Sequence, residues 1–183
     1  LLGMVIEALE QKPVGKSLET RIFGPLGMQR TFLWNDVPRP AFGLARAFLQ
    51  AQDNEMTNWN ISQGWAAGGV ISTVDDMHVF IEALVRGDLF QSPETLDSMQ
   101  QTFKTPDGAP LTLEVYGLGL QLVHQGYLGD LWGHGGQTLG YASKTIAGDK
   151  VSIVSFGTTS TNLMAYPAGG VSEALRAAGV SID

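Results

Sequence analysis

The spacing of apolar residues changes near residue 111, and this change does most to limit the folds that the chain can adopt. Before it, apolar side chains recur at three- and four-residue intervals, which is typical of helices that bury one face. After it, short apolar runs are bounded by glycine or aspartate and partly alternate with polar residues, which is typical of strands. Helices followed by an antiparallel meander predict an α+β fold.

The most regular helical pattern lies between Thr73 and Gly87. Thr73 is the predicted N-cap, with Asp76 three residues further on, and Gly87 is the predicted stop. Two shorter helices are predicted before it: residues 1–9, and a helix that Ser17 caps. Ser92 and the proline after it open another helix. Between residues 29 and 64 we expect a long, partly irregular connection, a kind of segment that often shapes binding sites.

Antiparallel strands are predicted in the second part of the chain, where apolar residues partly alternate over 113–122 and form short runs over 127–132, 139–146 and 151–156. Gly148 and Asp149 are expected to turn a hairpin between the last two strands. Residues 168–178 carry apolar positions at helical spacing and predict a final helix. The organisation is therefore a mainly helical portion over 1–110, with its long connection, followed by antiparallel strands and a C-terminal helix over 111–183.

Charge and composition narrow the range of partners. The net charge is −7, and the eleven basic residues are scattered along the chain, so nucleic acid and anionic membranes are poor partners. The chain has no cysteine, which excludes thiol catalysis and thiolate metal sites. No apolar run approaches the roughly 20 residues that cross a bilayer, so we expect no transmembrane segment.

One histidine is flanked by glycines in the stretch Trp132-Gly133-His134-Gly135-Gly136-Gln137. A histidine exchanges a proton near neutral pH, since its unperturbed pKa is about 6.5. The simpler interpretation is a histidine satisfied by hydrogen bonds at the end of a strand. Gly135 and Gly136 lack side chains, so a substrate could lie against their main chain, whereas a bulge or an edge strand is the structural alternative.

This stretch resembles the third active-site motif, Lys/His-x-Gly, of the serine β-lactamase and penicillin-binding-protein superfamily. The similar branch contains class C β-lactamases, D-alanyl-D-alanine carboxypeptidases and related esterases. Further segments before this motif also match the family and stand in the order expected for it. They are Leu1-Leu2-Gly3-Met4-Val5-Ile6-Glu7, Phe23-Gly24-Pro25-Leu26-Gly27-Met28, Ala66-Ala67-Gly68-Gly69-Val70-Ile71-Ser72-Thr73-Val74-Asp75-Asp76 and Tyr116-Gly117-Leu118-Gly119-Leu120. The resemblance implies a β-lactamase/transpeptidase-like fold and a bacterial serine hydrolase that works through an acyl-enzyme.

Two of the family's motifs, which carry the nucleophile and its partner, are missing from this chain. No lysine has a serine three residues before it, so Ser-x-x-Lys is absent, and no tyrosine has an asparagine two residues after it, so Tyr-x-Asn is absent. The resemblance therefore implies an incomplete single catalytic unit that lacks its N-terminal part. We expect this chain to be inactive alone and to require the missing N-terminal half as its partner.

The resemblance also implies which residues form a site. It assigns His134 as an acid/base or electrostatic partner of the nucleophile, Gly135 and Gly136 as substrate-binding residues, and the backbone N–H of Gln137 as a donor in the oxyanion hole. Thr159 and Asn162, after the last strand, are further candidates for binding substrate, although a polar turn is the simpler interpretation. No metal or organic cofactor is implied.

A departure from the family pattern bears on the substrate. Carboxypeptidase relatives grip a substrate carboxylate through an arginine shortly after the Tyr-Gly-Leu-Gly segment or through a hydroxyl in the third motif. Here the equivalent stretch, residues 121–123, has no cation, and Gly135 stands where relatives often have a hydroxyl. We therefore expect a small-molecule ester, amide or peptide-like substrate without a free carboxylate.

A rival hypothesis makes the chain a non-enzymatic module of the same fold. Without an N-terminal half, apolar faces of the first helix and of the sheet would be exposed, so the chain could bind peptides or associate with itself, including by domain swapping. For the family member, we expect a periplasmic or secreted location in a bacterium, and a cytoplasmic one is left open.

Overall fold

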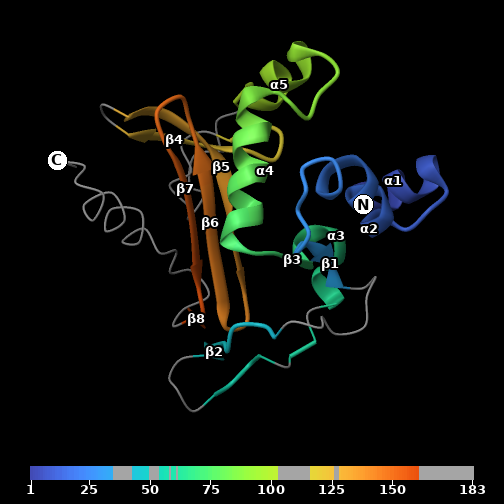
Figure 1. The fold of residues 1–183 in the computed structure, drawn as a ribbon, viewed down its shortest axis with the longest axis vertical. Helices are drawn as coiled ribbons and strands as arrows, with labels where there is room; N and C mark the ends of the chain where they lie inside the picture. The colour runs from blue at the N-terminus through green and yellow to red at the C-terminus, as the bar shows by residue number, and fades with distance from the viewer. Residues whose placement is uncertain are drawn as a thin grey trace, which may run out of the picture.

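A sheet of four antiparallel strands in the order β4-β5-β6-β7 forms the centre of the fold (Figure 1). The computed structural model describes residues 1–34, 43–49, 54–57, 59–60, 62–102, 116–125 and 128–160. The sheet strands are β4 (Gln121–Gln125), β5 (Gly129–Thr138), β6 (Tyr141–Ala147) and β7 (Ser152–Gly157). The α+β architecture expected from the change in apolar spacing is confirmed.

Helices dominate the first hundred residues. They are α1 (Leu2–Glu10), α2 (Val14–Leu18), the π-helical turn η1 (Glu19–Phe23), the 3-10 turn η3 (Ser62–Gly64), α3 (Trp65–Gly68), α4 (Val74–Arg86) and α5 (Pro93–Gln100). Two small sheets accompany them: β1 (Phe32–Leu33) pairs antiparallel with β3 (Val70–Ile71), and β2 (Phe48–Leu49) pairs parallel with β8 (Thr159–Ser160). In Figure 1, α1 and α2 lie apart from the main sheet, with α4 between them.

Buried apolar residues cover both faces of the main sheet, because neighbouring residues of a strand point to opposite faces. On one face, Ala147 packs with Ile81 and Leu84 of α4. On the other face, Ile146 packs with Leu131 and Ile153. Helix α4 thus covers the face of the sheet that carries Ala147. Within the described ranges, no helix is both long and apolar enough to span a bilayer.

Helix α4 is confirmed with the predicted caps. The Thr73 hydroxyl accepts a hydrogen bond from the backbone N–H of Asp76 at 3.2 Å, and Gly87 ends the helix with φ 81°. The Asp76 carboxylate does not complete a capping box: it accepts hydrogen bonds from the Arg30 backbone N–H at 2.9 Å and from the Thr31 hydroxyl at 2.7 Å. This side chain therefore attaches the segment before β1 to the start of α4.

The prediction that Ser17 caps the second helix is wrong. Helix α2 begins at Val14, and its first backbone N–H donates to the Glu7 carboxylate of α1 at 2.9 Å. Ser17 lies inside the helix, is buried, and donates to the Glu10 carboxylate at 2.7 Å. The acceptor that caps α2 comes from the preceding helix, so the local spacing of residues does not reveal it.

The strand predicted over 127–132 extends further in the structure, through residues 133–138. Strand β5 runs without interruption through the glycine-flanked histidine, and the chain turns only at Leu139 and Gly140, where Gly140 has φ 82°. Glycines interrupted the apolar pattern without interrupting the backbone pairing. The hairpin at Gly148 and Asp149 is confirmed by the pairing of Ala147 with Ser152. The predicted helix over 168–178 and the start of the strand at 127 lie outside the described residues.

Candidate functional site

Strand β5 extends beyond its neighbour β4, and the glycine-flanked histidine marks the point where this happens. The pairing with β4 runs from Gly129 to Gly133, where Gly133 faces Gln121. The pairing with β6 continues to Thr138. In the described part of the chain, therefore, residues 134–138 have a strand neighbour on the β6 side alone. Such an edge can accept an extended ligand by main-chain pairing.

His134 is the first residue of this extension and its side chain is exposed. The Nε2 atom of the ring lies 2.9 Å from the Tyr116 hydroxyl, and the two rings meet edge to face at 87° with centroids 5.6 Å apart. The Nδ1 atom lies 2.5 Å from the carbonyl oxygen of Gly135. Both ring nitrogens of His134 are thus engaged by polar groups of its own chain.

Tyr116 was not predicted as a site residue, although the segment that holds it was recognised. An added Cβ on Gly117 would lie 2.0 Å from the carbonyl oxygen of Met99, so only glycine allows this approach to the end of α5. The same carbonyl accepts a hydrogen bond from the Leu118 backbone N–H at 2.9 Å, and Gly119 turns with φ 78°. Gly117 and Gly119 were the feature of the sequence that could have indicated Tyr116 as a site residue, because together they hold it beside β5.

The glycines of the motif differ in their surroundings. An added Cβ on Gly133 would lie 2.0 Å from the Thr145 carbonyl oxygen, so this glycine is required by the close approach of β6. An added Cβ on Gly136 would meet the Ser143 hydroxyl at 3.0 Å, and that side chain can rotate away. Gly133 is therefore structural, whereas packing alone does not demand a glycine at Gly136.

Gly135 and Gln137 share one face of β5, opposite to His134 and Gly136. Lys144 of β6 pairs with Gly135 and donates from Nζ to the Gln121 side-chain oxygen of β4 at 3.0 Å. The lysine side chain therefore crosses β5, a path that the missing side chains of Gly133 and Gly135 leave open. Burial lowers the pKa of Lys144. This cation lies on the face opposite to His134.

The structure does not bring Thr159 to His134. The register places His134 opposite Thr145 and, one strand further, Val154, whereas Thr159 follows five residues later and pairs with Phe48 of β2. At about 3.3 Å per residue, this offset is roughly 16 Å along the strand. The physical reason is that β6 separates β5 from the strand that leads to Thr159. Asn162 lies outside the described residues.

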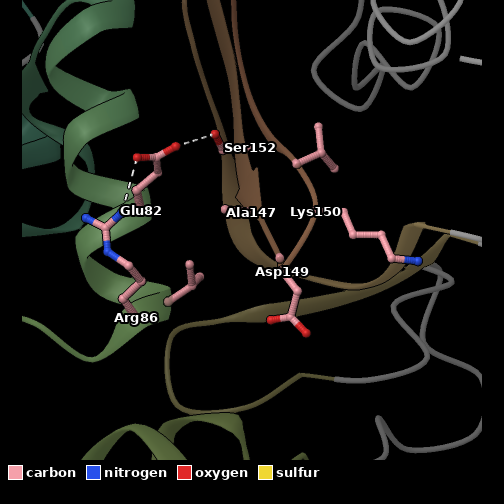
Figure 2. A pocket seen from close by; sticks show the side chains of 9 residues that line it. Glu82, Arg86, Ala147, Asp149, Lys150 and Ser152 are labelled. Atoms are coloured by element: carbon pink, nitrogen blue, oxygen red, sulfur yellow. Dashed lines mark hydrogen bonds and ion pairs between the residues drawn. The ribbon is translucent and has the colours of Figure 1, made fainter.

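A cavity of about 440 Å³ lies elsewhere, where the C-terminal end of α4 meets the β6–β7 turn (Figure 2). Charged side chains of both signs line it, namely Glu82, Arg86, Asp149 and Lys150. Glu82 and Arg86 pair with each other at 3.4 Å, and Arg86 also pairs with Asp88 at 2.9 Å. None of the predicted site residues lines this cavity, so we do not assign the site there.

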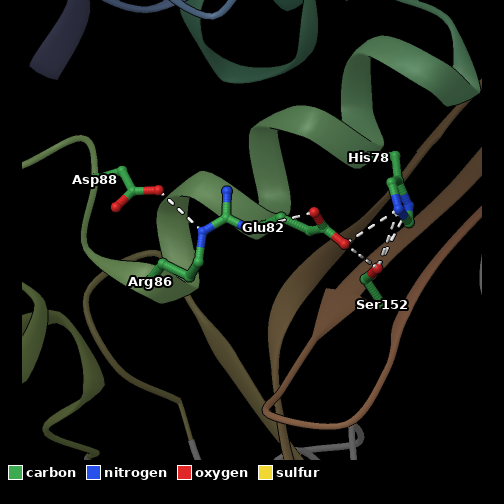
Figure 3. A network of polar contacts seen from close by, with 5 residues as sticks. All are labelled: His78, Glu82, Arg86, Asp88 and Ser152. Carbon is green, nitrogen blue, oxygen red and sulfur yellow. Dashed lines mark hydrogen bonds and ion pairs between the residues drawn. The ribbon is translucent and has the colours of Figure 1, made fainter.

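Next to that cavity, Ser152 meets His78 and Glu82, the residue types of a nucleophilic triad (Figure 3). The Ser152 hydroxyl donates to the Glu82 carboxylate at 3.0 Å, which holds the pKa of Glu82 below its usual value. The Ser152 oxygen lies 3.3 Å from Nε2 and 3.4 Å from Nδ1 of His78, and Nε2 lies 3.2 Å from Glu82. In a triad, the histidine stands between the serine and the acid, whereas here the serine donates directly to the acid. This cluster instead attaches α4 to β7.

A comparison with known protein families identifies a family whose sequence pattern this chain matches. The sequence model of the beta-lactamase family matches residues 1–168. This match includes every element from α1 to β8 and the whole of the glycine-flanked histidine motif.

Solved structures agree with this match. The D-amino acid amidase from Ochrobactrum anthropi SV3 complexed with L-phenylalanine is 26% identical with a TM-score of 0.79, over 97% of this chain and 56% of that chain. The D-stereospecific amidohydrolase from Streptomyces sp. is 27% identical with a TM-score of 0.73, over 87% of this chain and 48% of that chain. A penicillin-binding protein homologue from Pyrococcus abyssi, at 19% identity and a TM-score of 0.76, covers 98% of this chain and 41% of that chain and shares the fold. The chain therefore spans about half the length of the solved structures it matches.

Proposed function

Because the chain belongs to the beta-lactamase family, we propose that it forms the substrate-binding half of a serine hydrolase site that cleaves amide or ester bonds. The nucleophilic serine, with its lysine and tyrosine, would come from a polypeptide segment outside this chain. The observation that carries the proposal is the position of His134, at the start of the β5 segment that extends beyond β4. There, one proton-handling side chain stands beside main chain that a substrate can approach.

In the proposed reaction, the serine oxygen attacks the substrate carbonyl while its proton passes to the neighbouring base. The resulting oxyanion would be held by two backbone N–H groups, one of the serine and one of Gln137. His134 would stabilise the charges that develop beside the nucleophile. The tetrahedral intermediate would then collapse by breaking the bond to the amine or alcohol, which leaves with the proton that the base took from the serine, and water would hydrolyse the resulting acyl-enzyme. The loss of one oxyanion donor typically costs about 3 to 4 kcal/mol of barrier, so the Gln137 backbone would make a large contribution.

Among possible substrates, we favour amides and esters without a free carboxylate. The support is the absence of a cation from residues 121–123, together with the similarity to a D-amino acid amidase and a D-stereospecific amidohydrolase. The partly buried Lys144 is on the opposite face of β5 from His134, so it does not supply the missing carboxylate partner. Export to the periplasm or the cell exterior remains our proposal for the location.

The test is an assay of D-phenylalanine amide, a chromogenic ester and a β-lactam, with the chain alone and with the polypeptide that carries Ser-x-x-Lys and Tyr-x-Asn. We expect no turnover from the chain alone, since groups that act as a unit cannot be replaced by the remainder. The mixture should turn over at least one amide or ester. A mixture containing H134A should lose most of that rate. Turnover by the chain alone would refute the proposal.

A second candidate function, self-association, is favoured by the exposure of α1. Leu1 is 92% exposed, and Leu2 and Leu9 are each 78% exposed, which is unusual for large apolar side chains grouped on one helix. A second copy or the missing half of the catalytic unit could cover this face. Light scattering of the chain with and without its complementing half distinguishes these partners, because only self-association raises the mass of the chain alone.

A further inference from the structure

We propose that Tyr116 is a positioning residue, which holds the ring of His134 in one orientation through a hydrogen bond to Nε2. The contact itself stands on geometry: the hydroxyl lies 2.9 Å from Nε2, and the rings meet edge to face at 87°. Its consequence for turnover rests on the proposed function of His134. Tyr116 is outside the third motif by sequence, 18 residues before the histidine.

The direction of this hydrogen bond follows from the other ring nitrogen. Nδ1 faces the carbonyl oxygen of Gly135 at 2.5 Å, and a carbonyl oxygen only accepts hydrogen bonds. Nδ1 must therefore carry the proton. In the neutral ring, Nε2 is then the acceptor, so the Tyr116 hydroxyl donates to it.

A phenol suits this position because its hydroxyl can exchange roles without moving. When Nε2 gains a proton, the same Tyr116 oxygen accepts the hydrogen bond that the ring now donates. The ring orientation is thus maintained in both protonation states. Phenylalanine would keep the edge contact and lose the hydrogen bond in both states, which makes Y116F the informative variant.

The backbone around Tyr116 supports a fixed role. Gly117 lies against the Met99 carbonyl, Leu118 donates to that carbonyl at 2.9 Å, and the Gly117 backbone N–H donates to the Leu120 carbonyl at 2.8 Å. Tyr116 also pairs with Gln121, the residue that faces Gly133 on β5. The tyrosine is therefore held next to the strand that carries His134, independently of its own hydroxyl.

The test is the nitrogen-15 spectrum of the histidine rings in the full chain, recorded at a pH where the rings are neutral. In the wild type, we expect His134 to show a protonated Nδ1 and an Nε2 shifted by an accepted hydrogen bond. In Y116F, the Nε2 resonance should move towards that of an unbonded ring nitrogen, while Nδ1 stays protonated. The resonances of His78 and His124 serve as internal references, and H134Q assigns the third ring.

Y141F is the matched control, because it also removes a single hydroxyl, one that donates to the Ala45 carbonyl at 2.8 Å. It should leave the ring nitrogens of His134 unchanged. In the complemented enzyme, Y116F should lower kcat about fivefold with little change in KM, as expected for one neutral hydrogen bond. A protonated Nε2 in the neutral wild type, or identical His134 spectra in wild type and Y116F, would overturn the inference. Both of these spectroscopic results are independent of whether the complemented enzyme is active. A failure of this inference can therefore be told apart from a failure of the proposed function.

Discussion

At the scale of single residues, the glycine-flanked histidine combines two kinds of constraint. Gly133 is fixed by packing, because its missing side chain lets the Thr145 carbonyl approach β5. Gly136 meets only the rotatable Ser143 hydroxyl. On the opposite face from His134, the missing side chains of Gly133 and Gly135 let the Lys144 side chain cross β5 to reach Gln121. Only part of this stretch is therefore available for binding a substrate.

The first prediction separates these constraints. G133A should destabilise the fold by about 2 to 3 kcal/mol, the upper part of the usual cost of overpacking, because the new methyl group collides with backbone. G136A should cost less than about 1 kcal/mol, since Ser143 can change rotamer. The midpoint of urea unfolding measures both variants. In the complemented enzyme, G136A should raise KM, whereas equal destabilisation by the two variants would contradict the distinction.

At the scale of secondary-structure elements, the accuracy of sequence-based prediction depends on where the stabilising partner lies. Helix α4 was predicted with its caps because Thr73 and Gly87 act within the helix itself. The start of α2 was missed because the capping carboxylate, Glu7, belongs to another helix. Tyr116 was missed as a site residue for the same reason, because its contact with His134 depends on the docking of a turn on α5.

The second prediction concerns the cap of α4. T73A should lower the free energy of unfolding by about 1 kcal/mol, because the hydroxyl accepts the Asp76 backbone N–H. S92A is the matched control: Ser92 stands at the N-cap of α5, and its hydroxyl donates to the Glu94 side chain and caps no backbone group. Its cost in thermal or urea unfolding should be smaller. A larger loss for S92A than for T73A would contradict this account.

The third prediction is a pH dependence of stability. A hydrogen bond from Ser17, with further contacts from Lys12 and Arg21, lowers the pKa of Glu10 from 4.5 to about 2. Hydrogen bonds from Arg46 and then Thr57 lower the pKa of Glu55 from 4.5 to about 2. A depressed carboxyl pKa stabilises the folded state fully above the unfolded value, and this contribution disappears as the pH falls through the folded value.

The contribution of Glu10 and Glu55 to stability should therefore not change with pH above about pH 5.5. The free energy of unfolding should fall as the pH is lowered from about pH 4.5 to pH 2. Urea unfolding at a series of pH values measures this slope. The double variant E10Q/E55Q should show a shallower decline over that window, since neither position then titrates. A decline as steep as that of the wild type would show that other groups control acid unfolding.

At the scale of the whole molecule, the chain has the fold of its family and about half the length of its solved relatives. Two of its buried apolar clusters lie on the two faces of the main sheet, whereas α1 leaves large apolar side chains uncovered. The family resemblance predicted the fold, and the sequence itself lacks the family's Ser-x-x-Lys and Tyr-x-Asn. The apolar face expected to be exposed on the first helix is exposed in α1, whereas the main sheet, for which exposure was also expected, buries apolar residues on both faces. Sequence could not separate these two cases, because exposure depends on the contacts of the assembled structure.

The fourth prediction follows from that exposure. L2S/L9S should reduce binding of a dye specific for apolar surfaces, and should reduce any self-association seen by light scattering, because both side chains are 78% exposed. Its unfolding midpoint should change little. L33S is the contrasting variant: Leu33 is buried, so a polar residue there should cost several kcal/mol or prevent folding. Unchanged dye binding in L2S/L9S would place the apolar surface elsewhere.

The central claim is that this chain supplies one wall of a serine hydrolase site and that the nucleophile comes from outside it. The most direct measurement is intact-mass analysis after treatment with a fluorophosphonate, which labels activated serines. We predict no adduct on this chain, alone or complemented, and one adduct on the complementing polypeptide, formed more slowly with H134A. An adduct on this chain, for example on Ser152 beside His78 and Glu82, would contradict the claim.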